Sequence, residues 1–425
     1  MFTLKAYHNQ YLRLNQTTMK AVLSITLDPN AQLPPMPLAL GIALDRSGSM
    51  QGAKLKAALE GAMKVVLALD ETITFVVVVF ERQAKIVFGP ATGTPHNKQL
   101  AIQAMQRVYA KGGTAMSTAL NAVFDALGNN PTRTTKILFL TDGKNEGERR
   151  QQLDEAVARC SAANIAIHAW GIGTDWDGIE LRSMAQATRG NAGIIPTPNE
   201  IEAQFTSALK EIRKTALSRV SCCLWSPPGV AITAFQQVYP TLIPLRLEPD
   251  AANPRQQNVK LGSFNLGEQR DYLLDIQVAA KLPGQRFVMV RPSLRYVEAG
   301  KSEQEQKIDN TAWVYAEWTD VIALAAQVES HVAHYTSEGD LAQYIEEGQQ
   351  ALSRGDTKRA EHAFAQALEA SNRAGNAPIT RLLKDLLEEN ADGTVRLNPH
   401  ADLVTRKKLE MNAGRTGKAS DFTEE

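Results

Sequence analysis

The sequence predicts an α/β protein in which a doubly wound, mostly parallel β-sheet is inserted in, or flanked by, an antiparallel β-sandwich and is followed by a C-terminal helical region. Between residues 36 and 215, short continuous apolar runs alternate with amphipathic stretches of helical period. This alternation is typical of a parallel sheet with helices on both faces. The segments before and after it alternate apolar and polar residues between Pro, Gly and Asn turns, as antiparallel strands do.

The elements of the α/β region follow one another regularly. The apolar runs that we expect to form its sheet are 38–44, 73–80, 136–141, 165–173 and 191–196. The amphipathic stretches that we expect to be helices are 53–69, 117–127, 148–164, 178–188 and 199–217. One further run, 84–90, follows 73–80 so closely that we expect the two to pair as an antiparallel hairpin.

The flanking segments predict the remaining domains. Residues 1–35 are expected to supply the N-terminal strands of the β-sandwich and residues 216–305 the others, because the termini of a domain often lie close together. The α/β domain, 36–215, is then an insertion. Residues 311–390 have a helical period and predict a helical hairpin or bundle. Within them, the stretch 339–375 places its residues between Leu352 and Leu368 much as one tetratricopeptide helix pair does, but stacked repeats normally need three, so a generic hairpin is favoured.

Residues 391–425 are polar and weakly patterned, which predicts a flexible tail. Thr423 lies among acidic residues, the setting of an acidic-directed phosphorylation site, and a phosphothreonine there would recruit an Arg-bearing domain. As a second hypothesis, Asp421, Glu424 or Glu425 docks into the metal site of a neighbouring molecule. Both hypotheses rank below a simply solvated tail.

Composition limits the classes of partner. The 425 residues carry 46 basic and 46 acidic side chains, and a net charge of zero favours neither nucleic acid nor an anionic membrane. The apolar run 73–80 is too short to span a bilayer, and the first residues lack the apolar core of a secretory signal. Three cysteines, two of them adjacent at Cys222 and Cys223, do not suggest a disulfide framework. We therefore expect a cytoplasmic protein without a membrane span.

Polar residues gather where the predicted strands end. Asp45, Ser47 and Ser49 follow the run 38–44, Asp142 follows 136–141, and Thr114 lies in a glycine-containing loop just before a predicted helix. Each alone is typical of a turn or a helix N-cap. Together they lie where open α/β sheets place ligands, at the carboxyl ends of the strands.

These five side chains offer only oxygen atoms. Two carboxylates and three hydroxyls suit Mg²⁺, Mn²⁺ or Ca²⁺ and disfavour Zn²⁺, which prefers Cys and His. The hydroxyls are neutral, so the two aspartates at most balance the charge of the cation. If an aspartate coordinates only through water, the cation stays electrophilic and attracts a further anionic oxygen. A partner's Asp or Glu carboxylate is the obvious donor.

The motifs DRSGSM (45–50), GGTAM (112–116) and LTDG (140–143) resemble the metal-ion-dependent adhesion site of von Willebrand factor type A domains of the bacterial intracellular type. The resemblance covers residues 36–215 and implies a Rossmann-like fold. It also implies a metal ion, Mg²⁺ first, held by Asp45, Ser47, Ser49, Thr114 and Asp142, with a partner's carboxylate completing the coordination. The partners that it implies are AAA+ ATPases of the MoxR type or Ser/Thr kinase and phosphatase systems.

The sequence also bears on catalysis. It contains no H-E-x-x-H, no P-loop and no G-x-S-x-G motif in a strand-turn-helix setting, and its histidines are scattered. His168 lies in a predicted strand and is expected to pack in the core. His331 and His334 share a helical face, where packing is the commoner role. We expect a non-enzymatic interaction module. A metal-dependent hydrolase, and a scaffold that acts through its C-terminal helices, remain as alternatives.

Overall fold

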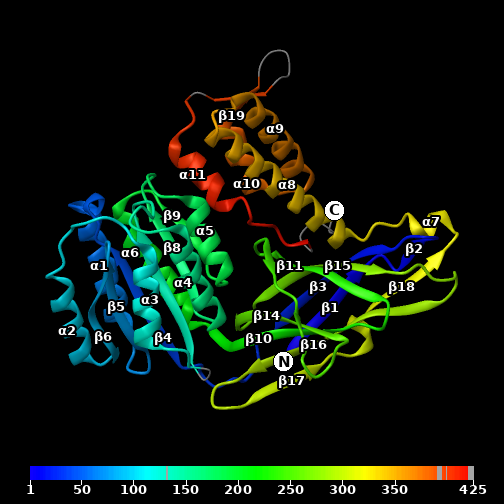
Figure 1. Ribbon diagram of the computed structural model, residues 1–425, viewed down its shortest axis with the longest axis horizontal. Coiled ribbons are helices and arrows are strands. Elements are labelled where there is room, and N and C mark those ends of the chain that lie inside the picture. Colours follow the sequence, from blue (N-terminus) through cyan, green and yellow to red (C-terminus); the bar gives the residue numbers. More distant parts are fainter. Residues whose placement is uncertain (131–132, 390–394, 399, 420–425) are drawn as a thin grey trace. The chain divides into compact units, whose positions relative to one another are not determined.

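A computed structural model describes residues 1–130, 133–389, 395–398 and 400–419 (Figure 1). The chain divides into two compact units. One unit, hereafter the α/β unit, consists of residues 33–218 and 297–302. The other, hereafter the β/helical unit, consists of residues 1–32, 219–296 and 303–425. In the described ranges, no helix combines the length and the apolar character that crossing a membrane requires.

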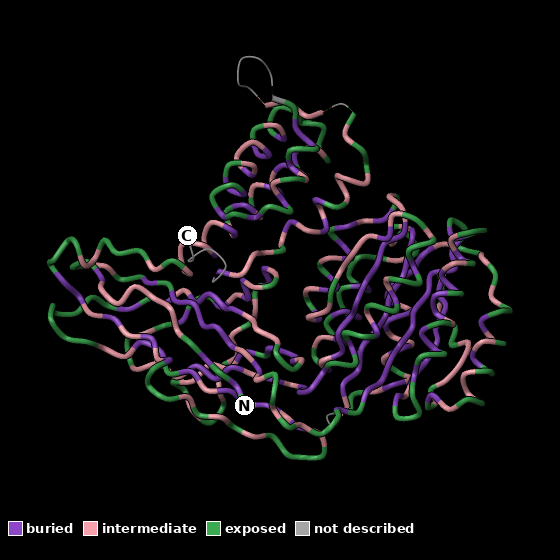
Figure 2. The backbone as a smooth tube through the Cα atoms, turned by 180° about the vertical axis from the view of Figure 1, so that it is seen from behind, coloured by how far each residue is buried: buried purple, intermediate pink, exposed green. Residues whose placement is uncertain are grey.

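The α/β unit is built on a mixed sheet in which only the edge strand β6 runs antiparallel to its neighbour. In spatial order its strands are β6 (Ala84–Thr92), β5 (Thr74–Phe80), β4 (Leu38–Asp45), β7 (Thr134–Thr141), β8 (Ala166–Ile172) and β9 (Ala192–Ile195). Every residue of β4 and β7 is buried, and Figure 2 shows buried backbone concentrated in these strands. The hairpin expected between 73–80 and 84–90 is confirmed.

Helices cover both faces of this sheet. They are α1 (Ala53–Ala68), α2 (Pro95–Met105), α3 (Met116–Leu127), α4 (Arg150–Ala162), α5 (Gly178–Ala187) and α6 (Ile201–Arg213). Leu40 and Ile42 of β4 lie in one core cluster with residues of α1, α2 and α6. On the opposite face, a Cβ added to Gly41 would lie 2.4 Å from a methyl of Val123 in α3, so glycine permits the close packing of this helix.

Helix α2 is absent from the elements expected from the sequence. Its apolar stripe is narrow, with only Ala101 and Met105 buried. Its start has a clear capping signal, because Thr94 accepts a hydrogen bond from the backbone N–H of Asn97 and Pro95 is the first helical residue.

The β/helical unit contains two antiparallel-rich sheets. The first has the order β1 (Phe2–His8), β3 (Thr18–Leu27), β15 (Gln269–Val278), β11 (Val230–Tyr239) and β12 (Ile243–Leu245). The second has the order β13 (Glu248–Pro249), β14 (Gln256–Asn265), β10 (Thr215–Trp225), β16 (Arg286–Val297), β18 (Val314–Thr319) and β2 (Tyr11–Arg13), with β17 (Glu303–Lys307) paired to β16. Strand β3 pairs directly with β15, so the N-terminal strands join the later ones as expected.

The C-terminal part of this unit is helical. Its elements are α7 (Ile322–Ala325), α8 (Ser330–Ser353), α9 (Thr357–Arg373), α10 (Ala377–Leu386), β19 (Leu387–Glu389), β20 (Val395–Leu397) and α11 (Leu403–Asn412). Helices α8 and α9 pack closely at Gly348. A Cβ on this residue would lie 2.6 Å from the ring of Phe364, so glycine permits the approach. The described chain therefore has the predicted fold class, a doubly wound sheet with antiparallel sheets and C-terminal helices.

Two boundaries need correction. The helical region predicted from 311 begins later, because Val314–Thr319 alternates buried and half-buried residues and forms a strand beside β16. The flexible tail predicted over 391–425 is wrong for its described part, where α11 buries Leu409 and Met411. The chain after this helix also bonds to the sandwich, since the Thr416 backbone N–H donates to the Pro240 carbonyl. Residues 421–425, and with them Thr423 and the tail carboxylates, lie outside the described residues.

Candidate metal centre

The two aspartates of the candidate site come from neighbouring strands. Asp45 is the last residue of β4 and Asp142 directly follows β7. These strands are parallel and in register, with Leu44 opposite Leu140, so both carboxylates reach the same edge of the sheet. This edge is the carboxyl end of the strands, where the sequence predicts the site.

Asp45 is fully buried, and both of its carboxylate oxygens accept hydrogen bonds. Oδ1 accepts from the Ser47 backbone N–H at 2.7 Å, and Oδ2 accepts from the Thr141 hydroxyl at 2.5 Å. Burial raises the pKa of Asp45 to about 6. The bonds from Thr141 and Ser47 act in the opposite direction, and the charge of Asp142 adds to the rise. The fold therefore holds a carboxylate whose negative charge lacks full compensation, and a cation would supply it.

The serine hydroxyls connect to the second carboxylate. The Ser47 and Ser49 Oγ atoms lie 3.0 Å apart, and the Ser49 hydroxyl donates to Asp142 Oδ1 at 2.7 Å. The other oxygen, Oδ2, accepts a hydrogen bond from Lys54 Nζ at 2.5 Å. Asp142 is fully buried, whereas the Lys54 side chain retains 30% of its exposure. The Asp142 carboxylate is thus already paired with the Lys54 ammonium group.

Thr114 joins the group from a third loop. A Cβ added to Gly143 would lie 3.3 Å from Thr114 Oγ1 and 3.8 Å from Ser49 Oγ, so both hydroxyls border the residue after Asp142. Two backbone bonds fix this loop. The Gly48 N–H donates to the Gly112 carbonyl at 3.0 Å, and the Gly147 N–H donates to the Thr114 carbonyl at 2.7 Å. The structure therefore brings all five predicted side chains to one place.

Gly112 makes the tight loop possible. Its φ of +78° lies in the left-handed region, and a Cβ there would meet a carboxylate oxygen of Glu81 at 2.3 Å. The sequence prediction missed two neighbours of the site, Thr141 and Lys54. Thr141 belongs to the LTDG motif, and Lys54 lies in the first turn of α1. The sequence therefore predicts which elements carry these two residues, but not their bonds to the aspartates.

The donor chemistry fits a hard divalent cation. The set consists of carboxylate and hydroxyl oxygens, which Mg²⁺, Mn²⁺ and Ca²⁺ accept. No cluster of three or more His, Cys, Asp or Glu side chains with metal-binding geometry occurs in the part of the chain that the structure describes. The short hydroxyl side chains on three loops, rather than a carboxylate cage, therefore define the candidate site.

The surroundings of the site are cationic and aromatic. Tyr109 keeps 63% of its surface exposed, and both the Arg46 guanidinium and the Lys111 ammonium lie 5.9 Å from the centre of its ring. Arg46 directly follows Asp45 and is joined to Glu81 by an ion pair of 3.6 Å. Lys111 directly precedes the loop that carries Thr114 and donates its backbone N–H to the Arg46 carbonyl. The exposed Lys111 ammonium and the exposed Tyr109 ring thus lie beside the two site loops, whereas the charge of Arg46 is buried and paired with Glu81.

Three histidines that the sequence analysis singled out, His168, His331 and His334, pack against neighbouring residues. His168 lies in β8, and burial, with the charge of Lys136, lowers its pKa to about 3. His331 stacks on Tyr7 with ring centres 3.7 Å apart, and His334 Nε2 lies 3.1 Å from the Gly417 carbonyl oxygen. The expectation that these side chains pack is confirmed.

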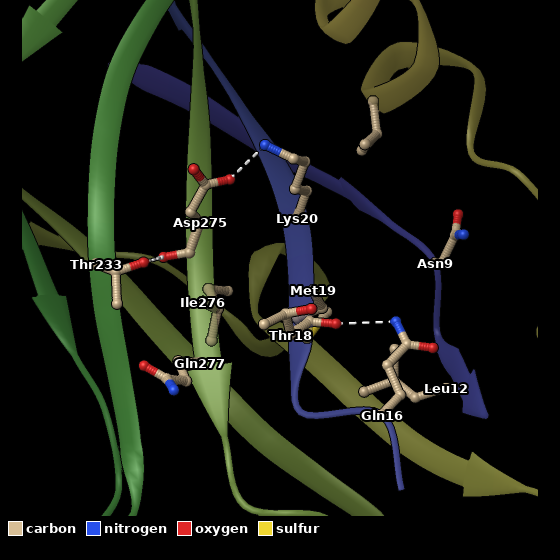
Figure 3. A pocket seen from close by; sticks show the side chains of 11 residues that line it. Asn9, Leu12, Gln16, Thr18, Met19, Lys20, Thr233, Asp275, Ile276 and Gln277 are labelled. Atoms are coloured by element: carbon tan, nitrogen blue, oxygen red, sulfur yellow. Dashed lines mark hydrogen bonds and ion pairs between the residues drawn. The ribbon is translucent and has the colours of Figure 1, made fainter. Parts of the chain in front are cut away.

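A separate hollow of about 610 Å³ lies in the β/helical unit (Figure 3). Several of its polar side chains are bonded within the protein. Lys20 Nζ lies 2.6 Å from Asp275 Oδ1, and Gln16 donates to the Thr18 carbonyl at 2.8 Å. The Thr233 hydroxyl donates to the Asp275 carbonyl. The hollow is lined by no His or Cys among the described residues, and its carboxylate, Asp275, is paired with Lys20.

Comparison with known proteins identifies the α/β unit. The family model of the von Willebrand factor type A domain matches residues 40–208. The structure of a von Willebrand factor type A protein from Catenulispora acidiphila is 27% identical, with a TM-score of 0.89, and the match covers 98% of this chain and 97% of that one. The ArnB paralog VWA2 from Sulfolobus acidocaldarius is 14% identical, with a TM-score of 0.61 and 98% of each chain covered, and supports the fold alone.

Curated relatives match over shorter parts. An uncharacterized protein of Synechocystis sp. is 27% identical over 257 residues, which are 60% of this chain and 60% of that protein. The inter-alpha-trypsin inhibitor heavy chain H3 of Bos taurus is 26% identical over 200 residues, 44% of this chain and 22% of the relative. The chain therefore covers less than two thirds of the length of these curated relatives.

Proposed function

Because the chain contains a von Willebrand factor type A domain, a kind of domain that generally mediates protein–protein interaction, we propose that it is a metal-dependent interaction module or adaptor. In this proposal the residues that hold the divalent cation, Mg²⁺ or alternatively Mn²⁺ or Ca²⁺, are Asp45, Ser47, Ser49, Thr114 and Asp142. The bound cation supplies an electrophilic position that accepts a carboxylate of a partner protein.

One observation carries this proposal: five oxygen-bearing side chains from three loops meet at the carboxyl edge of the sheet. The hydroxyls of Ser47 and Ser49 lie 3.0 Å apart, and the second of them bonds to Asp142. Thr141 and the Ser47 backbone N–H hold the Asp45 carboxylate in a fixed orientation. The chain's own residues therefore arrange the donors before a cation arrives, which lowers the cost of ordering them on binding.

The surroundings of the site favour an acidic partner. The exposed Lys111 ammonium lies 5.9 Å from the centre of the exposed Tyr109 ring, and positive charge beside a docking position attracts acidic segments and repels basic ones. Exposed tyrosine is also enriched among the residues that dominate interface energies. A partner segment with an Asp or Glu flanked by further acidic residues suits this surface best.

The same proposal assigns no catalysis to the chain. Metal-assisted hydrolysis needs a base that activates water, or a second metal ion. Lys54 is bonded to Asp142, and the described histidines that we placed, His168, His331 and His334, pack away from the five donors. We further propose that the protein works in the bacterial cytoplasm. The partners that we propose there are a MoxR-type AAA+ ATPase or a Ser/Thr kinase and phosphatase system.

The test is a pull-down with the full chain in Mg²⁺, repeated in EDTA and with two variants. Asp45→Ala removes a site carboxylate, whereas Asp125→Ala removes an exposed carboxylate that only pairs with Arg159 on the surface. We expect partners to be retained by wild type and Asp125→Ala in Mg²⁺ and lost in EDTA and with Asp45→Ala. Retention of all partners by folded Asp45→Ala in EDTA contradicts the proposal. Turnover of phosphate esters in Mg²⁺ that is lost in Asp142→Ala favours the hydrolase instead.

A further inference from the structure

Strand β16 carries an exposed arginine between two tryptophans. The Arg291 guanidinium carbon lies 4.6 Å from the ring centre of Trp225 and 4.2 Å from that of Trp313. On the same strand, Arg286 lies 3.8 Å from the ring centre of Tyr315. We call Trp225, Arg291 and Trp313 the arginine–tryptophan stack. All of its residues belong to the β/helical unit, so the stack is separate from the candidate metal centre.

An irregularity in the strand places these residues on one face. Strand β16 lies between β10, which ends with Trp225, and β18, which begins after Trp313. Its register with β18 shifts between Val288 and Val290. The shift displaces the alternation of side chains by one residue, so Arg286 and Arg291 both face the aromatic side. A regular strand would turn one of them away, because residues five positions apart point to opposite faces.

Arg291 and Arg295, which lie on the same strand, differ in their contacts with carboxylates. Arg295 contacts two carboxylates, Glu305 at 3.4 Å and Asp250 at 3.5 Å. Among the described residues, no carboxylate lies within 4.0 Å of the Arg291 guanidinium, and its side chain forms no hydrogen bond with them. Glu317 faces Arg286 across the strands but forms no ion pair with it within that distance in the same part of the chain. Arg291 is therefore an exposed cation beside two aromatic rings, with no ion-pair partner in the described part of the chain.

Stacking leaves the hydrogen-bonding edge of a guanidinium available. A guanidinium that lies over an aromatic ring keeps its N–H donors in its own plane, where they match the two oxygens of a carboxylate. The indole of Trp313 is itself fixed, since its N–H donates to the Ile308 carbonyl at 3.3 Å. The side chain of Arg291 is thus held in one orientation before binding, which reduces the entropy lost when a ligand orders it.

We propose that the arginine–tryptophan stack is a docking surface for an acidic segment of a partner protein. One Asp or Glu carboxylate of that segment accepts two parallel hydrogen bonds from Arg291. Apolar side chains next to it lie on the outer surfaces of Trp225 and Trp313. Trp and Arg are enriched among the residues that dominate binding energies, which favours a protein segment over a small ion. This site acts without metal and goes beyond the function proposed above.

The experiment measures fluorescence anisotropy of a short labelled peptide of alternating Glu and Val, with the Gln and Val peptide as its uncharged counterpart. Titrations use the full chain in EDTA, so the candidate metal centre makes no contribution. We expect the Glu peptide to bind and the Gln peptide to bind weakly. We expect Arg291→Ala to lower the affinity about tenfold or more, because the lost hydrogen bonds are charge-assisted.

Arg354→Ala is the matched control. Arg354 is exposed on the helical region, and its removal changes the net charge by the same amount. Arg291→Lys keeps the charge but lacks the planar pair of donors, so we expect it to lose most of the affinity with little effect on folding. Equal affinities of Arg291→Ala, Arg291→Lys and Arg354→Ala, or no binding by wild type, overturn the proposal. Displacement of the peptide by an equal concentration of inorganic phosphate also overturns it, because the site is then one for small anions.

Discussion

Replacing Lys54 by methionine tests how the candidate metal centre balances its charge. Lys54 Nζ lies 2.5 Å from Oδ2 of Asp142, a carboxylate with no exposed surface. Methionine has a similar length and apolar stem but no charge, so the variant leaves this carboxylate with the Ser49 hydroxyl as its remaining side-chain donor. A divalent cation at the site would supply the missing positive charge.

The structure gives the size of the effect. Removing one partner of a buried ion pair costs about 3–5 kcal/mol, because the other charge stays buried and unpaired. Lys54 keeps 30% of its side-chain exposure and Ser49 still donates, so water and the hydroxyl compensate part of the loss. We expect a loss of about 2 kcal/mol without metal, or roughly 4–8 °C in Tm for a domain of this size. Saturating Mg²⁺ is expected to restore most of it.

The assay is thermal unfolding of the full chain, followed through the transition of the α/β unit, in EDTA and in Mg²⁺. Lys56→Met is the matched control. Lys56 is 77% exposed and reaches Glu60 only at 4.0 Å, so its loss is expected to have almost no effect in either buffer. An equal destabilisation of Lys54→Met in EDTA and in Mg²⁺ would refute the reasoning, because the cation would then not act at Asp142.

Three further outcomes follow from single positions. Gly143→Ala places a methyl 3.3 Å from Thr114 Oγ1, so we expect Mg²⁺ affinity by calorimetry to fall several-fold while urea unfolding changes little. Gly171→Ala places a methyl 2.1 Å from the ring of buried Trp176, and we expect a loss of about 1–3 kcal/mol in urea unfolding. Burial lowers the pKa of His168 to about 3 in the folded protein, whereas in the unfolded chain this side chain has its ordinary pKa near 6.5. Below about pH 6.5 the unfolded state therefore binds more protons than the folded state. Stability is therefore lost as pH falls below about 6.5, and His168→Gln should lose about 2 kcal/mol less than wild type between pH 7 and 5 in urea unfolding.

The sequence was most informative where one physical cause dominates the pattern. The strands that became β4 and β7 are continuous apolar runs because both faces of a parallel sheet are covered. The positions of Asp45 and Asp142 follow from the ends of those runs. The prediction that their side chains come together with Ser47, Ser49 and Thr114 agrees with the geometry, whereas their binding of metal stays a proposal.

The rest of the fold depended on tertiary contacts that the pattern does not reveal. Val314–Thr319 was expected to belong to a helical region, but it forms a strand because it pairs with β16. Helix α11 is rich in polar residues and is ordered by burial of Leu409 and of the following Ala413 against the helical core. At the site, Lys54 and Asp142 are 88 positions apart in the sequence and share no local motif, so their contact appears only in three dimensions.

Anomalous diffraction from crystals soaked in Mn²⁺ tests the central claim most directly. We expect one strong peak at the carboxyl edge of the α/β sheet, about 2.1 Å from the hydroxyl oxygens of Ser47 and Ser49 as in octahedral sites of small hard cations. The same peak should lie beside Thr114 and Asp142, through direct bonds or through water. No peak at this edge in Mn²⁺-soaked crystals, or one bonded to other side chains, would contradict the account.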